Sequence, residues 1–366
     1  MTYSMPATTP NTSAGRLGQR LALTVKVTGV GLRVLPHLPE PVKRLISGGR
    51  RVVIDGNTLD SAMQVMLTGQ RLAGLNGMMA VGGPAVARQV LHEQAAFIDS
   101  RIVVPVEPVT IDGPAGPIRA RHYRNTADGA PLLMYIHGGG FVLGDLDTHD
   151  HLCRLLCREG GVHVLSVDYR LAPEHPAPAA AVDCLAAYQW ALTHAAELGA
   201  DPARVVVGGD SAGGNLATVV CLQARARSLP LPVLQFLLYP VTDLVADTRS
   251  KALFADGFFL TKADMDSFRD NYTSGSYLEL ADPVLSPLRA ADLAGMPPAL
   301  LLTAGFDPLR DEGEAYGRAL ADAGVPVDAR RFGSLVHGFA NFFPLGGDSA
   351  VAMAEVCSAL RAHLSR

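Results

Sequence analysis

The sequence predicts an α/β fold in which helices cover both faces of a mostly parallel sheet. From about residue 101 onward, short apolar segments alternate with helical patterns. Continuous apolar strands separated by helices are typical of parallel sheets that are buried on both faces. Glycine-rich or charged groups follow directly after several of these strands, and functional groups of such sheets lie on loops at the carboxyl ends of the strands.

The composition permits one large α/β domain with an appendage, or two domains. The 366 residues are 48% hydrophobic and 18% charged, with a formal net charge of -4. A chain of this length can bury a large core. Because the mild acidity provides no basic field for nucleic acid, we expect no nucleic-acid partner.

The cysteines do not suggest a disulfide framework. There are five of them, an odd number in a long chain. Cys153 and Cys157 lie four residues apart in a helical stretch, where a metal or redox pair is one interpretation. No second pair of ligands stands near them in the sequence, so we favour two small buried hydrophobic residues and expect no metal site.

The first hundred residues are mainly helical by pattern and differ from the rest. Residues 1–20 lack the apolar core of a signal peptide, from which we expect a cytoplasmic protein. Residues 21–35 are apolar but carry Lys26 and Arg33, and are too short to span a bilayer. As an amphipathic helix they would either lie on a membrane surface or cover a substrate pocket, which we favour. Residues 60–75 continue with helical spacing.

From residue 101 the chain reads as strands and helices in alternation. Residues 101–111 and 118–123 alternate apolar and polar side chains around an Asp-Gly-Pro turn, which predicts an antiparallel hairpin. Buried strands are predicted at 132–136, 162–167, 205–208, 233–239, 300–304 and 327–332. Helices are predicted at 151–159, 179–196, 211–225 and 312–323.

The segment around Ser211 has the pattern of a nucleophile elbow, G-x-S-x-G between a strand and a helix. Gly209 and Gly213 lack side chains where the tight turn must close, and the strained turn holds the serine hydroxyl above the sheet. The amide of Ala212 then lies at a helix N-terminus, directed to where negative charge would develop. The alternative is a glycine-rich turn with a capping serine.

A triglycine follows the strand at 132–136, in the segment His137-Gly-Gly-Gly-Phe141. Without Cβ atoms, its backbone amides can approach a ligand closely, as an oxyanion hole requires. A flexible turn is the alternative. Three glycines cost folding entropy that a plain turn would not require, so we favour function.

Two later loops carry the partners that a nucleophilic serine needs. Asp307 lies just past a predicted strand and could fix an imidazole tautomer. Asp311 qualifies on chemistry as well, but we prefer Asp307 because it is nearer the strand end. A lone histidine beside apolar residues is more often structural, yet His337 completes the order Ser, Asp, His that accompanies the elbow.

The charged, proline-rich segment after the strand at 162–167 is expected to be structural. We expect Arg170 to pair with Glu174 or Asp168 beneath the functional loops. His175 is a weaker candidate for chemistry, because a better-placed histidine follows.

These motifs together resemble a known family. The segments H-G-G-G-F, D-Y-R-L-A-P-E-H-P, G-D-S-A-G-G-N, D-P-L-R-D and H-G-F look like those of the hormone-sensitive-lipase-like branch of the α/β-hydrolases, in particular its bacterial family IV esterases. The resemblance covers about residues 100–366. It implies the α/β-hydrolase fold, with a mostly parallel eight-stranded sheet. It also implies a helical N-terminal cap at 1–100, a catalytic domain at 101–366 and a second cap segment at about 243–275.

The resemblance implies a role for each site residue. Ser211 would be the nucleophile, His337 the general base and acid, and Asp307 the orienting carboxylate. The oxyanion-hole amides would come from Gly138, Gly139 and Ala212. Asp210 and Asn215 would hold the geometry of the elbow rather than react.

The implied activity is hydrolysis of short- to medium-chain acyl esters through an acyl-enzyme, with no metal or organic cofactor. An amidase or formamidase on the same residues is an alternative. A non-catalytic receptor is another, against which the presence of His337 argues. The aromatic residues between Phe254 and Tyr272 could form core or an acyl pocket, and both alternatives stay open. In this family the last strand is also the edge through which a homodimer would form.

Overall fold

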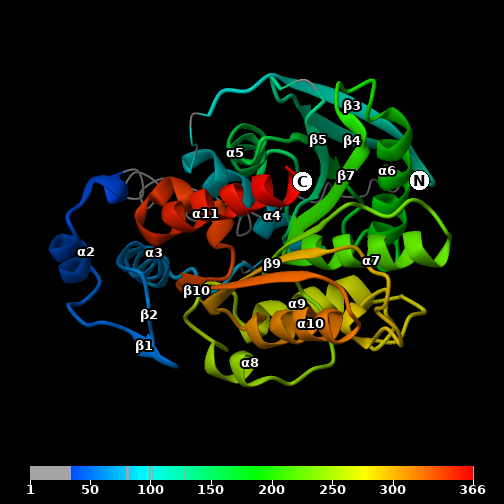
Figure 1. Ribbon diagram of the computed structural model, residues 1–366. Coiled ribbons are helices and arrows are strands. Elements are labelled where there is room, and N and C mark those ends of the chain that lie inside the picture. Colours follow the sequence, from blue (N-terminus) through cyan, green and yellow to red (C-terminus); the bar gives the residue numbers. More distant parts are fainter. Residues whose placement is uncertain (1–33, 80–81, 99, 101, 128, 366) are drawn as a thin grey trace, which may run out of the picture.

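A mostly parallel eight-stranded sheet forms the centre of the molecule (Figure 1). The computed structural model describes residues 34–365 except 80–81, 99, 101 and 128. The strand order is β10-β9-β8-β7-β5-β6-β4-β3. The strands are β3 (Val106–Gly113), β4 (Gly116–Tyr123), β5 (Pro131–Ile136), β6 (His163–Asp168), β7 (Asp201–Asp210), β8 (Gln235–Leu238), β9 (Ala299–Phe306) and β10 (Val327–Val336).

The pairing of these strands confirms the predicted fold class. β3 pairs with β4 and β4 with β6 in antiparallel fashion, whereas β5 to β10 pair in parallel. Every residue of β5, β8 and β9 is buried, as expected for strands covered on both faces. The predicted hairpin is β3 and β4, which turns at Pro114 and Ala115.

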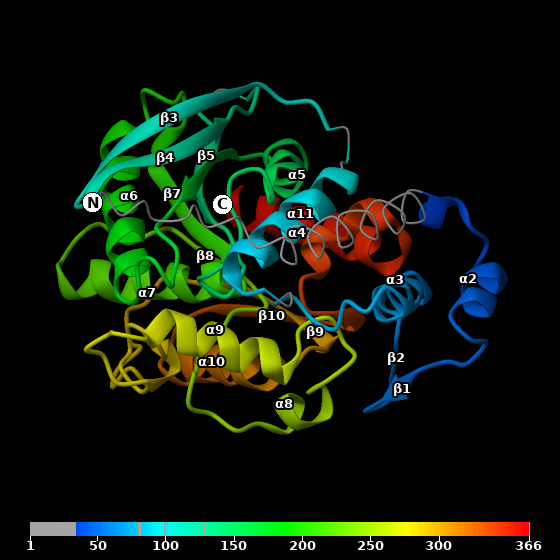
Figure 2. The ribbon, with the colours of Figure 1, turned by 180° about the vertical axis from the view of Figure 1, so that it is seen from behind.

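Helices cover both faces of the sheet, and each face has its own apolar core (Figures 1 and 2). On one face pack α5 (Asp150–Gly160) and α11 (Gly347–Leu364), together with part of the N-terminal region. On the other face pack α6 (Ala179–His194), α7 (Ala212–Ala226) and α10 (Arg310–Asp322). Cys153 and Cys157 are buried among the apolar side chains under α5, which confirms their interpretation as small hydrophobic residues.

Two further groups of short elements flank the sheet. The N-terminal group comprises η1 (Leu35–His37), α2 (Glu40–Ile46), the small hairpin β1 (Val53–Ile54) and β2 (Asn57–Thr58), α3 (Ser61–Leu72) and α4 (Pro84–Phe97). After β8 come α8 (Arg249–Leu253), α9 (Lys262–Thr273) and η2 (Pro287–Arg289), and after β10 come η3 (Phe339–Asn341) and η4 (Phe343–Leu345). Figure 2 shows α4 and α9 on the same side of the molecule.

The helix predicted within residues 60–75 is confirmed as α3, which begins at an N-cap made by the Asp60 side chain. The apolar segment predicted at 21–35 lies outside the described residues, apart from its last two. Within the described part of the chain, no helix combines the length and the hydropathy needed to cross a bilayer.

The prediction for Arg170 is wrong. Its guanidinium binds Asp183 of α6, with N–O distances of 2.7 and 2.8 Å. Asp168 pairs instead with an arginine of β4, and Glu174 with an arginine of α4. Asp183, Asp168 and Glu174 are thus each paired with an arginine of another part of the chain. The positions of these residues in the sequence did not indicate the pairs.

Candidate active site

Ser211 occupies a strained turn between β7 and α7. Its φ angle is 55°, in the left-handed region that non-glycine residues rarely adopt. A Cβ atom at Gly209 or at Gly213 would collide with the carbonyl oxygen of Ile136 at the end of β5. Only glycine fits at these two positions, and this close approach to β5 holds the serine in its turn.

Ser211, Asp307 and His337 each stand one residue beyond the end of a strand. β7 ends at Asp210, β9 at Phe306 and β10 at Val336. Because these strands run in parallel, their carboxyl ends share one edge of the sheet, and the three side chains meet there.

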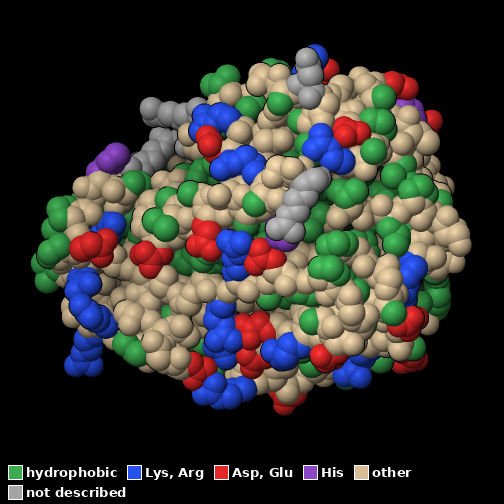
Figure 3. Space-filling view, in the orientation of Figure 1, with side chains coloured by type: hydrophobic (Ala, Val, Ile, Leu, Met, Phe, Trp, Pro, Cys, Tyr) green, Lys and Arg blue, Asp and Glu red, His purple; other side chains and the backbone are tan. Residues whose placement is uncertain are grey.

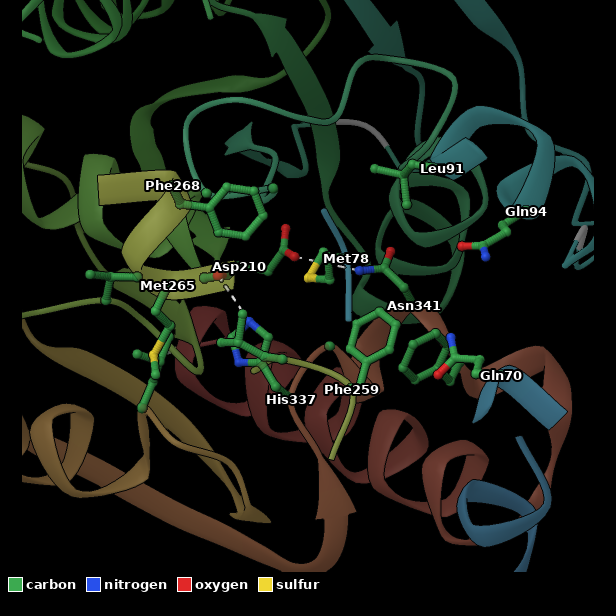
Figure 4. A pocket seen from close by; sticks show the side chains of 18 of the residues that line it. Gln70, Met78, Leu91, Gln94, Asp210, Phe259, Met265, Phe268, His337 and Asn341 are labelled. Atoms are coloured by element: carbon green, nitrogen blue, oxygen red, sulfur yellow. Dashed lines mark hydrogen bonds between the residues drawn. The ribbon is translucent and has the colours of Figure 1, made fainter. Parts of the chain in front are cut away.

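A continuous chain of hydrogen bonds joins the three side chains. His337 Nε2 lies 2.9 Å from Ser211 Oγ, and His337 Nδ1 lies 2.9 Å from Asp307 Oδ2. The bond that His337 makes on the serine side is drawn in Figure 4. All three residues are buried, with Ser211 the most exposed at 8%. This is the arrangement of a hydroxyl, a base and an orienting acid.

Asp307, rather than Asp311, contacts the imidazole. The second oxygen of Asp307 accepts a hydrogen bond from the Leu309 amide at 2.8 Å, which fixes the carboxylate on its own turn. Asp311 accepts instead from the Ser250 amide at 2.8 Å and from Arg310 Nε at 2.9 Å. Of the two candidates, the structure thus places the one nearer the strand end beside His337.

The amide of Gly138 is bound within the protein, so the prediction that it belongs to the oxyanion hole is wrong. It donates to Asp210 Oδ1 at 2.9 Å, inside the protein. Gly139 and Gly140 line the cavity beside Ser211, and their amides have no acceptor within the described part of the chain. The Asp210 carboxylate therefore binds the first glycine amide, and the next two amides, in residues that line the cavity, have no acceptor among the described residues.

Asp210 anchors this loop. Besides Gly138, it accepts a hydrogen bond from the Tyr135 hydroxyl at 2.7 Å, and His149 Nε2 lies 3.4 Å away. Burial alone would raise the pKa of the Asp210 carboxyl, but His149 and the Tyr135 hydroxyl hold it below its ordinary value. Asn341 Nδ2 approaches the other oxygen at 3.4 Å (Figure 4). The carboxylate thus stays ionised and holds the glycine loop to the elbow.

Asn215 holds the other side of the elbow, as expected. Its amide nitrogen donates to the carbonyl of Val241 at 3.0 Å and to that of Leu285 at 2.9 Å. These bonds tie the first turn of α7 to the loop that follows β8.

Ser211 and His337 open onto a cavity of about 990 Å³. Its walls are mostly apolar and come from the glycine loop, the N-terminal elements and the segment after β8. Figure 4 shows Met78 and Leu91 on one side, Met265 and Phe268 on another, and Phe259 near His337. Such a cavity suits a ligand with an apolar chain and a reacting group at the serine.

The comparisons with known proteins agree with this geometry. A family model described as α/β hydrolase fold matches residues 133–341. The chain is 56% identical over 349 residues to the carboxylic ester hydrolase LipN of Mycobacterium tuberculosis, covering 93% of this chain and 92% of that protein. The chain belongs to the α/β-hydrolase family.

Other α/β-hydrolases resemble the chain over most of its length. The esterase LipI of Mycobacterium tuberculosis is 43% identical over 70% of this chain and 78% of its own. The solved structure of a thermostable esterase from Pseudomonas putida superposes with a TM-score of 0.79 at 38% identity, covering 84% of this chain and 98% of the esterase.

The aromatic segment of this α/β-hydrolase divides between core and cavity. Phe259, Leu260 and Phe268 line the cavity. Phe254 and Tyr272 are fully buried away from it, and Tyr272 stacks on Phe141 with ring centroids 3.9 Å apart.

One carboxylate joins α9 to the N-terminal region. Asp264 Oδ1 accepts hydrogen bonds from the amides of Met78 at 3.0 Å and Met79 at 2.8 Å. Its other oxygen accepts from the amide of Thr261, the N-cap of α9, at 3.0 Å. One turn further along α9, the ring of Phe268 lies against Gly140. Helix α9 therefore contacts both the glycine loop and the N-terminal wall of the cavity.

The side chains that could bind a metal lie outside the group formed by Ser211, His337 and Asp307. In the described part of the α/β-hydrolase, one group of donors comes close enough for a metal, with His92, Asp145 and Asp147 within 4.8 Å of one another. Asp147 already pairs with Arg121, and Asp145 accepts from amides of its own loop. These contacts account for the cluster without an ion.

Four features of the site were missed from the sequence. Gly140 takes the place assigned to Gly138, and Tyr239 packs its ring edge on His337 with centroids 4.8 Å apart. Met78 reaches the cavity from the N-terminal region, and Asn341 approaches Asp210. The triglycine and the strand at 233–239 gave a signal for the first two, but nothing in the pattern singled out the last two.

Proposed function

We propose that this protein hydrolyses carboxylic esters of short- to medium-chain acids through an acyl-enzyme on Ser211. The observation that carries the proposal is the hydrogen-bonded chain of Ser211, His337 and Asp307 at the wall of an apolar cavity. Its relatives in the family, named carboxylic ester hydrolase and esterase, support the same reaction class.

The proposed reaction begins with removal of a proton. His337 Nε2 takes the proton of Ser211 as the hydroxyl attacks the ester carbonyl, because a neutral hydroxyl is a weak nucleophile. Asp307 holds the opposite ring nitrogen and stabilises the imidazolium that forms. His337 then donates the proton to the departing alcohol, and water repeats the sequence to release the acid.

The negative charge of the tetrahedral intermediate needs donors beside Ser211. We assign this role to the amides of Gly139, Gly140 and Ala212. The first two belong to residues that line the cavity, and the third begins α7, where the helix dipole also favours negative charge. Asp210 contributes indirectly by fixing the loop through Gly138.

We also propose that the N-terminal elements and the segment after β8 form a two-part cap over the site. Both contribute cavity walls, Met78 and Leu91 from the first and Met265 and Phe268 from the second. A cavity of about 990 Å³ is at the upper end of the usual range for small-molecule sites and leaves room for a medium acyl chain.

Hydrolysis of p-nitrophenyl esters from acetyl to palmitoyl tests the proposal. We expect the highest kcat/KM at a short or medium acyl chain, and a loss on the order of a millionfold in kcat for Ser211→Ala. Urea unfolding of the variant shows whether its fold is intact. Unchanged hydrolysis by folded Ser211→Ala would overturn the mechanism, and a maximum at palmitoyl would overturn the proposed chain length.

A further inference from the structure

The beginning of the chain is strongly basic although the whole chain is mildly acidic. Residues 1–51 hold eight of the 31 Lys and Arg residues but only one of the 35 Asp and Glu residues. The remaining residues therefore carry a net negative charge. A charge asymmetry of this kind indicates a region that meets an anionic partner, such as a nucleic acid or a membrane.

Helix α2 lies within this basic stretch and turns apolar side chains outward. Val42, Leu45 and Ile46 have the spacing i, i+3, i+4 that places residues on one face of a helix. Their exposed fractions are 38%, 77% and 51%. Figures 1 and 2 show α2 at one end of the molecule, away from the sheet.

Two polar side chains of α2 connect the helix to the rest of the protein. Glu40 accepts a hydrogen bond from Ser61 of α3 at 2.6 Å, and Lys43 binds Glu40 at 3.1 Å. The Lys43 side chain is buried, with 6% exposed. Lys43 is the one buried residue of α2, so the helix leaves its apolar side chains exposed, whereas an ordinary surface helix buries them.

Further exposed cations and one further exposed apolar residue lie in the same N-terminal region. Arg44, Arg50 and Arg51 are exposed and form no ion pair with any described residue. Leu72, at the end of α3, is 83% exposed. Hydrophobic side chains gather over α2 at the left edge of Figure 3, with Lys or Arg side chains below them.

The same region is one border of the cavity. Val34, Leu38 and Ile46 line the cavity that also contains Ser211. Val34 and Ile46 are about half exposed, so the cavity reaches the molecular surface here. A partner seated on α2 would therefore lie beside an entrance to the site.

We propose that the surface formed by Val42, Leu45, Ile46, Leu72, Arg44, Arg50 and Arg51, the α2 surface, binds the face of an anionic lipid bilayer. Apolar side chains at this spacing insert at the boundary between headgroups and acyl chains, and nearby arginines bind anionic headgroups. An acidic protein partner could pair with the arginines, but it would provide no apolar environment for the exposed Leu45 and Val42. The acidic remainder of the chain is repelled by the same bilayer, which orients the α2 surface toward it.

Co-sedimentation of the full chain with vesicles tests this proposal without substrate. The vesicles are phosphatidylcholine alone, or phosphatidylcholine with about a quarter phosphatidylglycerol. We expect binding to the anionic vesicles, weakened by added salt, and little binding to the neutral ones. The R44Q/R50Q/R51Q variant should bind on the order of 100-fold more weakly.

Two further variants make the test specific. V42S/L45S removes two apolar side chains that do not line the cavity, so it should lose vesicle binding while its hydrolysis of a soluble ester stays unchanged. R227Q/R318Q/R361Q removes exposed arginines outside the α2 surface and should bind like the parent chain.

Three results would overturn the proposal. The first is absence of binding to either kind of vesicle, and the second is equal binding by the parent chain and V42S/L45S. The third is a change in oligomeric mass in V42S/L45S without lipid binding, which would assign the α2 surface to a second copy of the chain. Because binding is measured without turnover, the outcome is independent of the proposed hydrolysis.

Discussion

At the scale of single residues, the site depends on three side chains that each follow the last residue of a strand. Their positions are fixed by backbone contacts: Ser211 by the close approach of its glycines to β5, and Asp307 by the Leu309 amide. His337 is held between Asp307 and Ser211 and against the ring of Tyr239. Such preorganisation lets the groups act without rearrangement during the reaction.

Asp307 and Asp311, the two candidates from the sequence for the partner of His337, provide a matched pair of variants. Asp307→Asn keeps the shape of the side chain but removes the charge that orients and stabilises the imidazole. We expect kcat to fall by on the order of 10⁴-fold on a soluble ester. Asp311→Asn is the control and should stay within a few-fold of the parent chain, since Asp311 contacts Ser250 and Arg310. Equal losses in the two variants would contradict the assignment.

The sequence motifs and their order predicted Ser211, Asp307 and His337, because the type of each residue indicates its chemical role. The choice among the three glycine amides could not be predicted in the same way. It depends on which amide the Asp210 carboxylate reaches, and that is decided by the packing of β5 against β7. Met78 likewise lines the cavity at a point where its amide donates to Asp264 of α9, a contact between segments far apart in the sequence.

At the scale of elements, α9 connects the two parts of the chain that wall the cavity. Its Asp264 accepts the amides of Met78 and Met79, and its Phe268 and Tyr272 pack on the glycine loop. We therefore expect α9 to control how the N-terminal wall is positioned over the serine.

Asp264→Asn tests this connection. An asparagine has one acceptor oxygen where the carboxylate uses two, so either the Met78 and Met79 amides or the N-cap loses its partner. We expect the unfolding free energy to fall by about 1–3 kcal/mol. We also expect selectivity among acyl chain lengths to weaken more than kcat on an acetyl ester does.

The matched control is Asp270→Asn, on the same helix but exposed and paired, among the described residues, only with Arg269. It should change neither stability nor chain-length selectivity. If Asp264→Asn lowered kcat on every ester by the same factor, with no change in selectivity, α9 would not set the cavity wall.

Strands were easier to predict than their ends. β5 and β9 are buried throughout and appear where expected. The predicted last strand, 327–332, stops at Phe332. The strand instead continues to Val336 through a register shift against β9, which brings its end next to His337. Irregularities of this kind depend on the neighbouring strand and leave little trace in the sequence.

At the scale of the whole molecule, two apolar cores enclose the sheet and bury several titratable groups with it. His122 of β4 is 2% exposed, and its Nε2 lies 2.9 Å from His163 Nδ1. Burial, with the neighbouring His163 as a second cause, lowers the pKa of His122 to about 4.

This lowered pKa predicts how stability depends on pH. Between about pH 6.5 and pH 4 the unfolded chain binds a proton at His122 that the folded chain does not, so the unfolding free energy falls as the pH falls. From pH 7 to pH 5 the contribution of His122 is about 2 kcal/mol. Urea unfolding of His122→Leu should show a pH dependence smaller by this amount. The exposed His175, replaced by leucine, serves as the control, and an unaltered pH dependence in His122→Leu would contradict the prediction.

The central claim is that Ser211 is the reactive nucleophile of a hydrogen-bonded triad, and covalent labelling tests it most directly. The folded protein is treated with a fluorophosphonate, and the modified residue is located by peptide mass spectrometry. A single adduct on Ser211, formed far more slowly in His337→Ala, is the predicted result. A folded protein that stays unlabelled, or an adduct on a different residue, would contradict the claim.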